Sequence, residues 1–213
     1  MYRYLFFDLD GTLTDPAVGI TNSVMYALNK YGISVSDRTS LFPFIGPPLM
    51  YSFQNFYGFS EKQAEQAVAY YREYFSRTGI FENEVYAQIP EVLSRLKQAG
   101  HILVLATSKP EEYAKRILTH FSLMEYFDFV AGATMGAGRQ EKAEVIAYAL
   151  SSLSISDRSG VLMIGDRKHD ILGAKANRLK SCGVLYGFGD REELTQAGAD
   201  MLLESVSDLL TLL

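Results

Sequence analysis

Residues 1–15 of the chain, MYRYLFFDLDGTLTD, decide the fold class. The short apolar run at residues 4–7 is typical of a strand that is buried on both faces, as in a parallel sheet. Asp8 and Asp10 follow this run, and Gly11 comes next. Because residues i and i+2 of a strand point the same way, roughly 6–7 Å apart, both carboxylates are expected at the strand's carboxyl end. An Asp-Gly turn explains Asp10 and Gly11 but leaves Asp8 unexplained.

The two acids predict a metal site. Carboxylates this close repel each other unless a proton or a cation lies between them. A hard ion that prefers oxygen ligands, such as Mg2+, would remove the repulsion. The carboxyl edge of an open α/β sheet is also where ligands bind. Asp8 and Asp10 therefore favour a functional site over a plain turn.

Further short apolar runs predict the rest of a sheet. They cover residues 101–107, 127–132, 160–166, 181–187 and 200–204. Helical patterns lie between most of these runs, and one of them places Val145, Ile146 and Ala149 on a single face. Alternating strands and helices require right-handed crossovers. The expected fold is α/β, with a doubly wound, Rossmann-like parallel sheet.

Residues 15–88 interrupt this alternation with helical patterns alone. Ser60 and Gln63 fit a capping box, and the apolar residues after it recur on one helical face: Ala64, Ala67, Val68, Tyr71 and Phe75. No strand is expected in this segment. The predicted domains are an α/β core of residues 1–14 plus 89–213 and an inserted all-helical domain of residues 15–88.

Composition limits the possible partners. The net charge is −5 and the basic residues are scattered, which disfavours nucleic acid and anionic membrane surfaces as partners. A single cysteine, Cys182, excludes an intramolecular disulfide. No apolar run approaches the ~18 residues of a membrane span. A cytoplasmic protein, monomeric or homodimeric, is expected.

A second pair of acids marks another strand end. The stretch GVLMIGDRKHD, residues 160–170, places Asp166 at the tip of a strand and Asp170 four residues later. Asp170 is also explained as an acid at a helix N-terminus. That interpretation leaves Asp166 unexplained, so acids are expected to gather at one edge of the sheet.

Two weaker signals involve hydroxyl and ammonium groups. Thr107 and Ser108 end the strand at residues 101–107, and Ser108 to Glu111 fit a capping box. A hydroxyl and free backbone N–H groups at a helix start also form an anion site, and both interpretations can hold together. Lys142 precedes another helical pattern, where a lone lysine is ordinarily solvated.

These four segments, in this order, resemble the motifs of the haloacid dehalogenase superfamily of phosphatases. DLDGT at residues 8–12 matches the first motif and the run ending in Thr107 the second. Lys142 falls at the third, and GDRKHD at residues 165–170 matches the fourth, GDxxxD. The helical insert resembles the cap domain of the subclass that contains phosphoglycolate phosphatases, β-phosphoglucomutases and some nucleotidases.

The resemblance implies a role for each acid. Asp8 would be the nucleophile that forms an aspartyl-phosphate, and Asp10 would be the general acid and base. Mg2+ would be held by Asp8, by the backbone carbonyl of Asp10 and by Asp166, with Asp170 orienting the site from close by.

The resemblance also implies a phosphate-binding set. Thr107, the N–H of Ser108 and the ammonium of Lys142 would hold the oxygens of the transferring phosphoryl group. The inserted domain would act as a cap that selects the substrate, and residues 44–49 are the suspected selecting loop. No arginine lies between Arg38 and Arg72 to hold a second phosphate, which disfavours a sugar-phosphate mutase.

Three hypotheses for function follow. The first is a Mg2+-dependent phosphatase of a small phosphorylated metabolite, such as phosphoglycolate or a sugar phosphate. The second is a nucleoside 5'-monophosphatase with the same chemistry. The third is a binding module that keeps the fold without turnover, which the presence of all the motif residues disfavours.

Overall fold

The structure of the chain is a computed structural model that describes residues 2–136 and 138–213. It divides into two compact units, one formed by Met1–Thr14 with Val85–Leu213 and the other by Asp15–Glu84. No helix in the described ranges combines the length and the apolar character of a membrane span.

The first unit is built on a parallel sheet of six strands. Their order is β5-β4-β1-β6-β7-β8, and neighbouring strands pair in parallel. The strands are β1 Tyr4–Phe7, β4 Ile102–Pro110, β5 Phe129–Ala133, β6 Val161–Gly165, β7 Lys180–Val184 and β8 Met201–Leu203. All six expected strands are present, so the predicted doubly wound α/β fold is confirmed.

β1 lies at the centre of the sheet because its residues are apolar on both faces. Leu5 pairs with Leu103 of β4 and with Leu162 of β6, and Leu5, Phe6 and Phe7 have no exposed surface. A strand buried on both faces has no polar face to alternate with, which explains its continuous apolar run. The loop after β1 therefore leaves the middle of the sheet's carboxyl edge.

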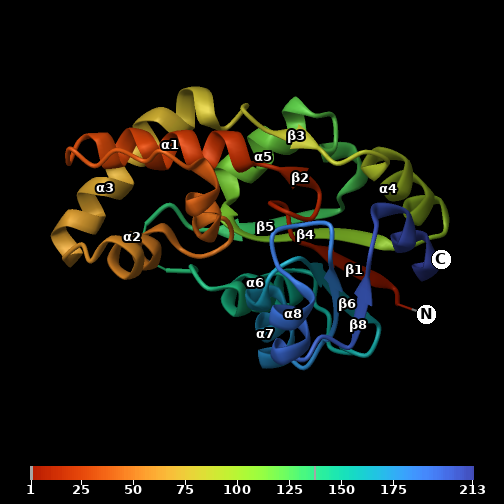
Figure 1. Ribbon diagram of the computed structural model, residues 1–213. Coiled ribbons are helices and arrows are strands. Elements are labelled where there is room, and N and C mark those ends of the chain that lie inside the picture. Colours follow the sequence, from red (N-terminus) through yellow and green to blue (C-terminus); the bar gives the residue numbers. More distant parts are fainter. Residues whose placement is uncertain (1, 137) are drawn as a thin grey trace. The chain divides into compact units, whose positions relative to one another are not determined.

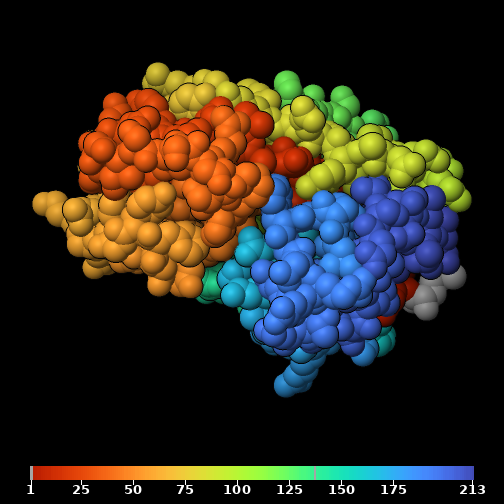
Figure 2. Space-filling model, in the orientation of Figure 1, coloured from red at the N-terminus to blue at the C-terminus, as the bar shows by residue number. Residues whose placement is uncertain are grey.

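Helices cover both faces of this sheet. Figure 1 shows α4 (Ile89–Gln98) and α5 (Glu111–His120) on one side, and α6 (Lys142–Ser152), α7 (Lys168–Ala176) and α8 (Arg191–Ala197) on the other. Short 3-10 helices are η3 (Met124–Tyr126) and η4 (Val206–Leu212). Val145, Ile146 and Ala149 of α6 pack with Phe6 and Met163 in one buried cluster, as their spacing predicts. The C-terminal part of the chain, which includes α8, β8 and η4, forms part of the surface of this unit and is blue in Figure 2.

The second unit is almost entirely helical. It contains α1 Ala17–Asn29, the 3-10 helix η1 Arg38–Phe44, α2 Leu49–Tyr57, α3 Glu61–Tyr74 and the π-helical turn η2 Phe75–Gly79. The capping box of Ser60 and Gln63 is present, and the apolar stripe that follows it is buried. α1 meets η2 through Gly19 and Gly79, since a Cβ on Gly19 would lie 1.9 Å from the carbonyl oxygen of Gly79.

One expectation about this segment is wrong. Two short strands, β2 Thr14–Asp15 and β3 Glu84–Val85, pair where the chain leaves the first unit and returns to it. β3 lies within residues 15–88, where no strand is expected. A pairing of two residues is too short to produce the period-2 pattern by which strands are recognised in a sequence.

Candidate active site

Asp8 stands directly after β1 at the carboxyl edge of the sheet. Its N–H donates to the carbonyl of Ile164 over 2.9 Å, which continues the parallel pairing with β6. The chain then turns sharply, because the carbonyl of Leu9 accepts the N–H of Leu13 over 2.8 Å and Gly11 adopts a φ of +82°. Strand and turn together leave Asp8 and Asp10 buried.

Asp166 occupies the corresponding place after β6 and has no exposed surface. Its Oδ2 accepts the N–H of Phe188 over 2.8 Å, and its Oδ1 accepts the hydroxyl of Thr12 over 3.3 Å. Two glycines make room for it: an added Cβ would lie 2.1 Å from its Oδ2 at Gly11 and 2.4 Å from its Cβ at Gly187. The Asp166 carboxylate therefore has a fixed direction.

Asp170 has one oxygen in its own helix and one in the acidic cluster. Its Oδ2 accepts the N–H of Arg167 over 3.1 Å at the start of α7, while its Oδ1 lies 2.7 Å from Nζ of Lys142. The interpretation as a helix N-terminal acid is thus correct for one oxygen only. The carboxylate is buried and also belongs to the cluster around Asp8.

Lys142, the first residue of α6, is buried rather than solvated, with 4% of its surface exposed. Its Nζ lies 2.7 Å from Oδ1 of Asp8 and 2.7 Å from Oδ1 of Asp170, and it donates to the carbonyl of Ala106 over 3.0 Å. Burial opposes the charged form, but the carboxylates of Asp170 and Asp8 outweigh it and raise the pKa of Lys142. Lys142 is therefore a charged ammonium group that binds the carboxylates of Asp8 and Asp170 and the backbone of β4.

The structure places the hydroxyl pair in an irregular part of β4. The register between β4 and β5 shifts between Ala106 and Pro110, so the ladder is broken across residues 107–109. Thr107 is buried there and its Oγ1 accepts the N–H of Lys109 over 3.2 Å. Ser108 is half-buried.

The predicted capping box at Ser108 is wrong. β4 continues to Pro110, and the residue that precedes α5 is Pro110, which makes no side-chain capping bond. A residue before proline is held in the extended region, so Lys109 prolongs the strand instead of starting the helix. Ser108 keeps its place beside Thr107 but not the capping role.

Lys109 is a site residue that the sequence does not predict. Its Nζ lies 2.9 Å from Oδ2 of Asp10, and the two side chains are only 6% and 11% exposed. In the sequence Lys109 is just a polar residue between Ser108 and Pro110, and nothing local predicts a partner about a hundred positions away. Its position two residues after Thr107, the end of the second motif, is the single local signal of a role at the site.

The loop after β7 was missed as well. Tyr186 donates its hydroxyl to the carbonyl of Thr12 over 3.0 Å, and the N–H of Phe188 binds Asp166. Burial, with Asp166 nearby, raises the pKa of Tyr186 well above its usual range. The glycines at 187 and 189 in the sequence YGFG were the available signal for a close backbone approach.

Negative charge exceeds positive charge in this buried group. The group contains four aspartates and two lysines: Asp8, Asp10, Asp166, Asp170, Lys109 and Lys142. If all six side chains are ionised, two negative charges have no positive partner. Burial, Asp170 and Asp8 raise the pKa of Asp166 well above its usual value. Burial likewise raises the pKa of Asp170 to about 6 and that of Asp10, against the pull of Lys142 and Lys109 respectively.

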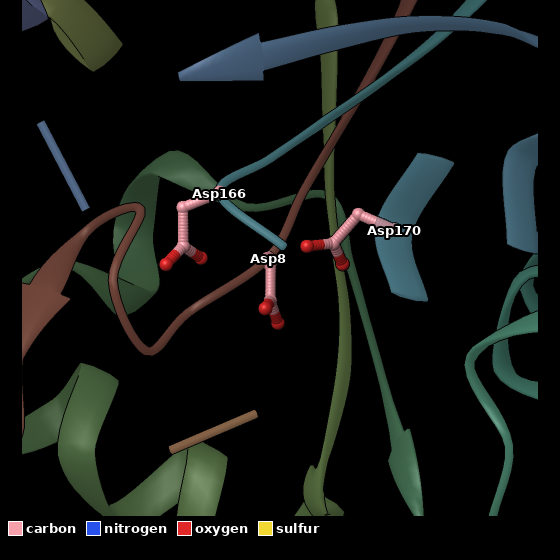
Figure 3. Close-up of side chains that lie close together, drawn as sticks. All are labelled: Asp8, Asp166 and Asp170. Atoms are coloured by element: carbon pink, nitrogen blue, oxygen red, sulfur yellow. The ribbon is translucent and has the colours of Figure 1, made fainter. Parts of the chain in front are cut away.

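The residues present fit a divalent cation. One oxygen each from Asp8, Asp166 and Asp170 lies within 4.8 Å of the others, and all three residues are buried. Figure 3 shows the three carboxylates, with Asp8 drawn between the other two; Asp8 follows β1, while Asp166 and Asp170 both belong to the segment from the end of β6 to the start of α7. A cluster of oxygen ligands with two surplus negative charges is what a hard divalent ion prefers. The Asp10 carboxylate is paired with Lys109 instead.

Comparisons with known proteins agree with this geometry. The family model described as "Haloacid dehalogenase-like hydrolase" matches residues 5–184. A 5'-nucleotidase of Pseudomonas aeruginosa is 47% identical over 193 residues, which cover 91% of this chain and 87% of that protein. Tyrosine-protein kinase PtkA of Mycobacterium tuberculosis is 39% identical over 188 residues, covering 88% of this chain and 63% of that protein.

A solved structure of similar sequence has the same fold. A predicted phosphatase from Clostridium acetobutylicum is 50% identical, with a TM-score of 0.96 and coverage of 99% of this chain and 97% of that one. Similarity of this kind extends over the α/β unit and the inserted helices together.

Proposed function

This chain belongs to the haloacid dehalogenase-like hydrolases and is a phosphatase of phosphate esters, and we propose that it works through a phosphorylated Asp8 with a divalent metal ion. The observation that carries the proposal is the buried group of Asp8, Asp10, Asp166, Asp170 and two lysines at the carboxyl edge of one sheet. Such a concentration of buried charge costs stability, and sites with perturbed pKa values of this kind are typical of catalysis.

The proposed first step transfers the phosphoryl group to the protein. A carboxylate oxygen of Asp8 attacks phosphorus, and the bond between phosphorus and the leaving-group oxygen breaks. Asp10, in its protonated form, gives its proton to that oxygen, so the leaving group departs as an alcohol. Burial raises the pKa of Asp10, which favours the protonated form that this step needs.

The second step is hydrolysis of the aspartyl-phosphate. A water oxygen attacks phosphorus, Asp10 takes a proton from the water, and the bond between Asp8 and phosphorus breaks. Inorganic phosphate leaves, and Asp8 and Asp10 return to their initial states. One pair of carboxylates thus completes the cycle without any external acid or base.

Mg2+ is the proposed ion, with Asp8, the backbone carbonyl of Asp10 and Asp166 as its ligands and Asp170 close by. When bound, it would offset the negative charge that otherwise keeps an anionic carboxylate away from an anionic phosphate. The convergence of three buried carboxylates supports this assignment.

The remaining site residues have proposed roles in holding the phosphate. Thr107 accepts the N–H of Lys109, which leaves its O–H free to donate to a phosphate oxygen. The N–H of Ser108 is proposed as a second donor. Lys142 supplies positive charge and, through its contacts with Asp8 and Asp170, keeps the nucleophile in place.

We propose nucleoside 5'-monophosphates as the substrate class, ahead of phosphoglycolate or a sugar phosphate. The support is the name of the 47% identical Pseudomonas protein. The helical unit is proposed as the cap that selects the leaving group. Within the suspected loop, Phe44 and Ile45 are buried in this unit, so residues 46–49 are the better candidates for substrate contact.

A panel of phosphate esters tests the proposal. With Mg2+, the purified protein should hydrolyse p-nitrophenyl phosphate and should prefer nucleoside 5'-monophosphates to phosphoglycolate and sugar phosphates. EDTA and Asp8→Asn should each abolish turnover. Phosphoglycolate at the head of the ranking would overturn the substrate class, and inactivity on every ester would support the binding-module hypothesis. Incubation with ATP and a tyrosine peptide tests the kinase activity that the name of PtkA suggests.

A further inference from the structure

We propose that Lys109 is a positioning residue that holds the Asp10 carboxylate for proton transfer to the leaving group. The inference rests on the function proposed above and adds a residue to it. Lys109 would determine which oxygen of Asp10 faces the substrate. This role differs from that of Lys142, which contacts Asp8 and Asp170.

The contact itself is an ion pair shielded from water. Nζ of Lys109 lies 2.9 Å from Oδ2 of Asp10, and neither side chain is more than 11% exposed. Burying a lysine is costly unless a partner compensates its charge. The pairing of an exposed lysine with an acid is readily broken by motion of its side chain. Lys109 is buried against Asp10, so this pair is held in place.

The backbone around Lys109 explains how the ammonium reaches Asp10. The β4–β5 ladder shifts between Ala106 and Pro110, and Pro110 keeps Lys109 extended. The N–H of Lys109 is bound to Oγ1 of Thr107 over 3.2 Å. A single irregular segment therefore fixes both the hydroxyl proposed for phosphate binding and the ammonium that binds the acid. Irregularities in strand pairing of this kind re-aim side chains at functional sites.

The two oxygens of Asp10 are left in different situations. Oδ2 is engaged by Lys109, while Oδ1 is buried and has no hydrogen-bond partner within residues 2–136 and 138–213. A buried oxygen without a partner is unfavourable in the free protein. Lys109 thus reserves Oδ1 for the proton that passes to the leaving oxygen in the first step and returns from water in the second.

This role differs from substrate binding in a measurable way. Proton donation matters greatly when the leaving group is a strong base and little when it departs as a stabilised anion such as p-nitrophenolate. A misplaced acid therefore slows phenyl phosphate far more than p-nitrophenyl phosphate. A lysine that only held the phosphoryl group would affect both esters equally, since their phosphoryl groups are identical.

The experiment compares kcat and KM of wild type, Lys109→Met and Lys109→Arg on p-nitrophenyl phosphate and phenyl phosphate. For Lys109→Met, kcat/KM on phenyl phosphate should fall on the order of 10²-fold, the cost of a misplaced catalytic group, and much less on p-nitrophenyl phosphate. Lys109→Arg should restore part of the loss because it keeps the charge. Lys97→Met removes a lysine that pairs with Asp128 at the other edge of the sheet, and it should change neither ester.

Two further measurements keep the result independent of folding. In the Asp10→Asn background, adding Lys109→Met should cause no further loss on phenyl phosphate, since no acid remains to be positioned. Fluoroberyllate should still bind Asp8 in Lys109→Met, as seen by 19F NMR, because the nucleophile is unchanged.

Equal losses on both esters, a raised KM with unchanged kcat, or additive losses in the double variant would each overturn the inference. The proposed function fails in a different way: wild type itself would hydrolyse neither ester. The two failures are therefore distinguishable in the same set of assays.

Discussion

Aspartates lie at both edges of the sheet, and the two groups behave differently. At the amino edge, Asp128 accepts the N–H of Leu103 over 2.9 Å and pairs with Lys97 over 2.7 Å. Asp200 likewise accepts the N–H of Ser181 over 2.9 Å and pairs with Lys180. Each of these carboxylates is partly exposed, accepts a backbone N–H near the start of a strand and pairs with its own lysine.

At the carboxyl edge the aspartates are buried and outnumber their lysines by two. Burial raises the pKa of Asp166, whereas at Asp200 the bonds from Lys180 and Ser181 outweigh burial and lower the pKa. The same residue type thus stabilises the fold at one edge and costs stability at the other. A buried group that lowers stability is typical of a functional site. The difference between the two groups of aspartates therefore distinguishes residues that stabilise the fold from residues of the candidate active site.

The largest expected effect is at Asp8, the proposed nucleophile. Asp8→Asn should lower turnover by on the order of 10⁴-fold or more, as loss of a nucleophile does. The fold should persist, because the change removes a buried negative charge from a group that has too many. Steady-state kinetics and thermal unfolding measure the two quantities. Wild-type turnover in this variant would contradict the view that the aspartates at the carboxyl edge are catalytic and those at the amino edge structural.

The next effect is at Asp10, the proposed general acid. Asp10→Asn should cut kcat by ~10²–10⁴-fold, the usual contribution of general acid–base catalysis. The matched control is Asp128→Asn, which changes an aspartate that also pairs with a lysine and should leave kcat unchanged. If both variants lost activity to the same degree, the position of the acid at the sheet edge would have no special meaning.

A third prediction concerns metal binding without turnover. Mg2+ at 100 times its Kd should stabilise the wild-type protein by about 2.7 kcal/mol, the linkage expected for one site. Asp166→Asn should abolish that gain, because it removes a buried carboxylate that is a proposed ligand of the ion. In metal-free buffer the variant should be more stable than wild type by about 1 kcal/mol, as repulsion among the acids falls. Unfolding in urea with and without Mg2+ measures both, and equal Mg2+ stabilisation of both proteins would contradict the proposed site.

The smallest effect is at the amino edge. Asp200→Asn should cost about 1 kcal/mol of unfolding free energy near pH 7, in the range of a few partly solvated hydrogen bonds. The pKa of Asp200 is lowered in the folded state, so its stabilisation is present above the ordinary value of 3.8 and is lost as the pH falls through the lowered value. The difference between wild type and variant should therefore vanish in strong acid. kcat should not change, and a loss of kcat would show that the two edges are coupled.

Local sequence was sufficient for the elements of the α/β unit. The apolar run before Asp8 predicts a strand buried on both faces because no polar residue interrupts it, and the same holds for the run before Asp166. Parallel strands then bring their carboxyl ends to one edge, so the gathering of these acids follows from topology alone. Local sequence was sufficient for one helix of the other unit as well, because the stripe at Ala64 to Phe75 predicts α3.

Other features depend on residues that are distant in the chain. Nothing near Lys109 distinguishes an ammonium that pairs with Asp10, and the helix-start position of Lys142 suggests solvent rather than burial. Ser108 is a different case, because the deciding residue is close by: Ser108 fits a cap by residue type, but Pro110 keeps the strand extended past it.

The positions of the strands and of the acids along the chain can be read from the residues alone, because hydrophobic period and residue type are local properties of the chain. Which charged side chains pair with each other depends instead on how the folded segments pack. The shift in the β4–β5 ladder aims Lys109 at Asp10, and the loop at Tyr186 to Gly189 closes around Asp166. Such contacts depend on side-chain direction and burial, which are set when segments that are not neighbours in the chain pack together: Lys109 and Asp10 are about a hundred positions apart, and Phe188 and Asp166 lie on opposite sides of β7 in the sequence.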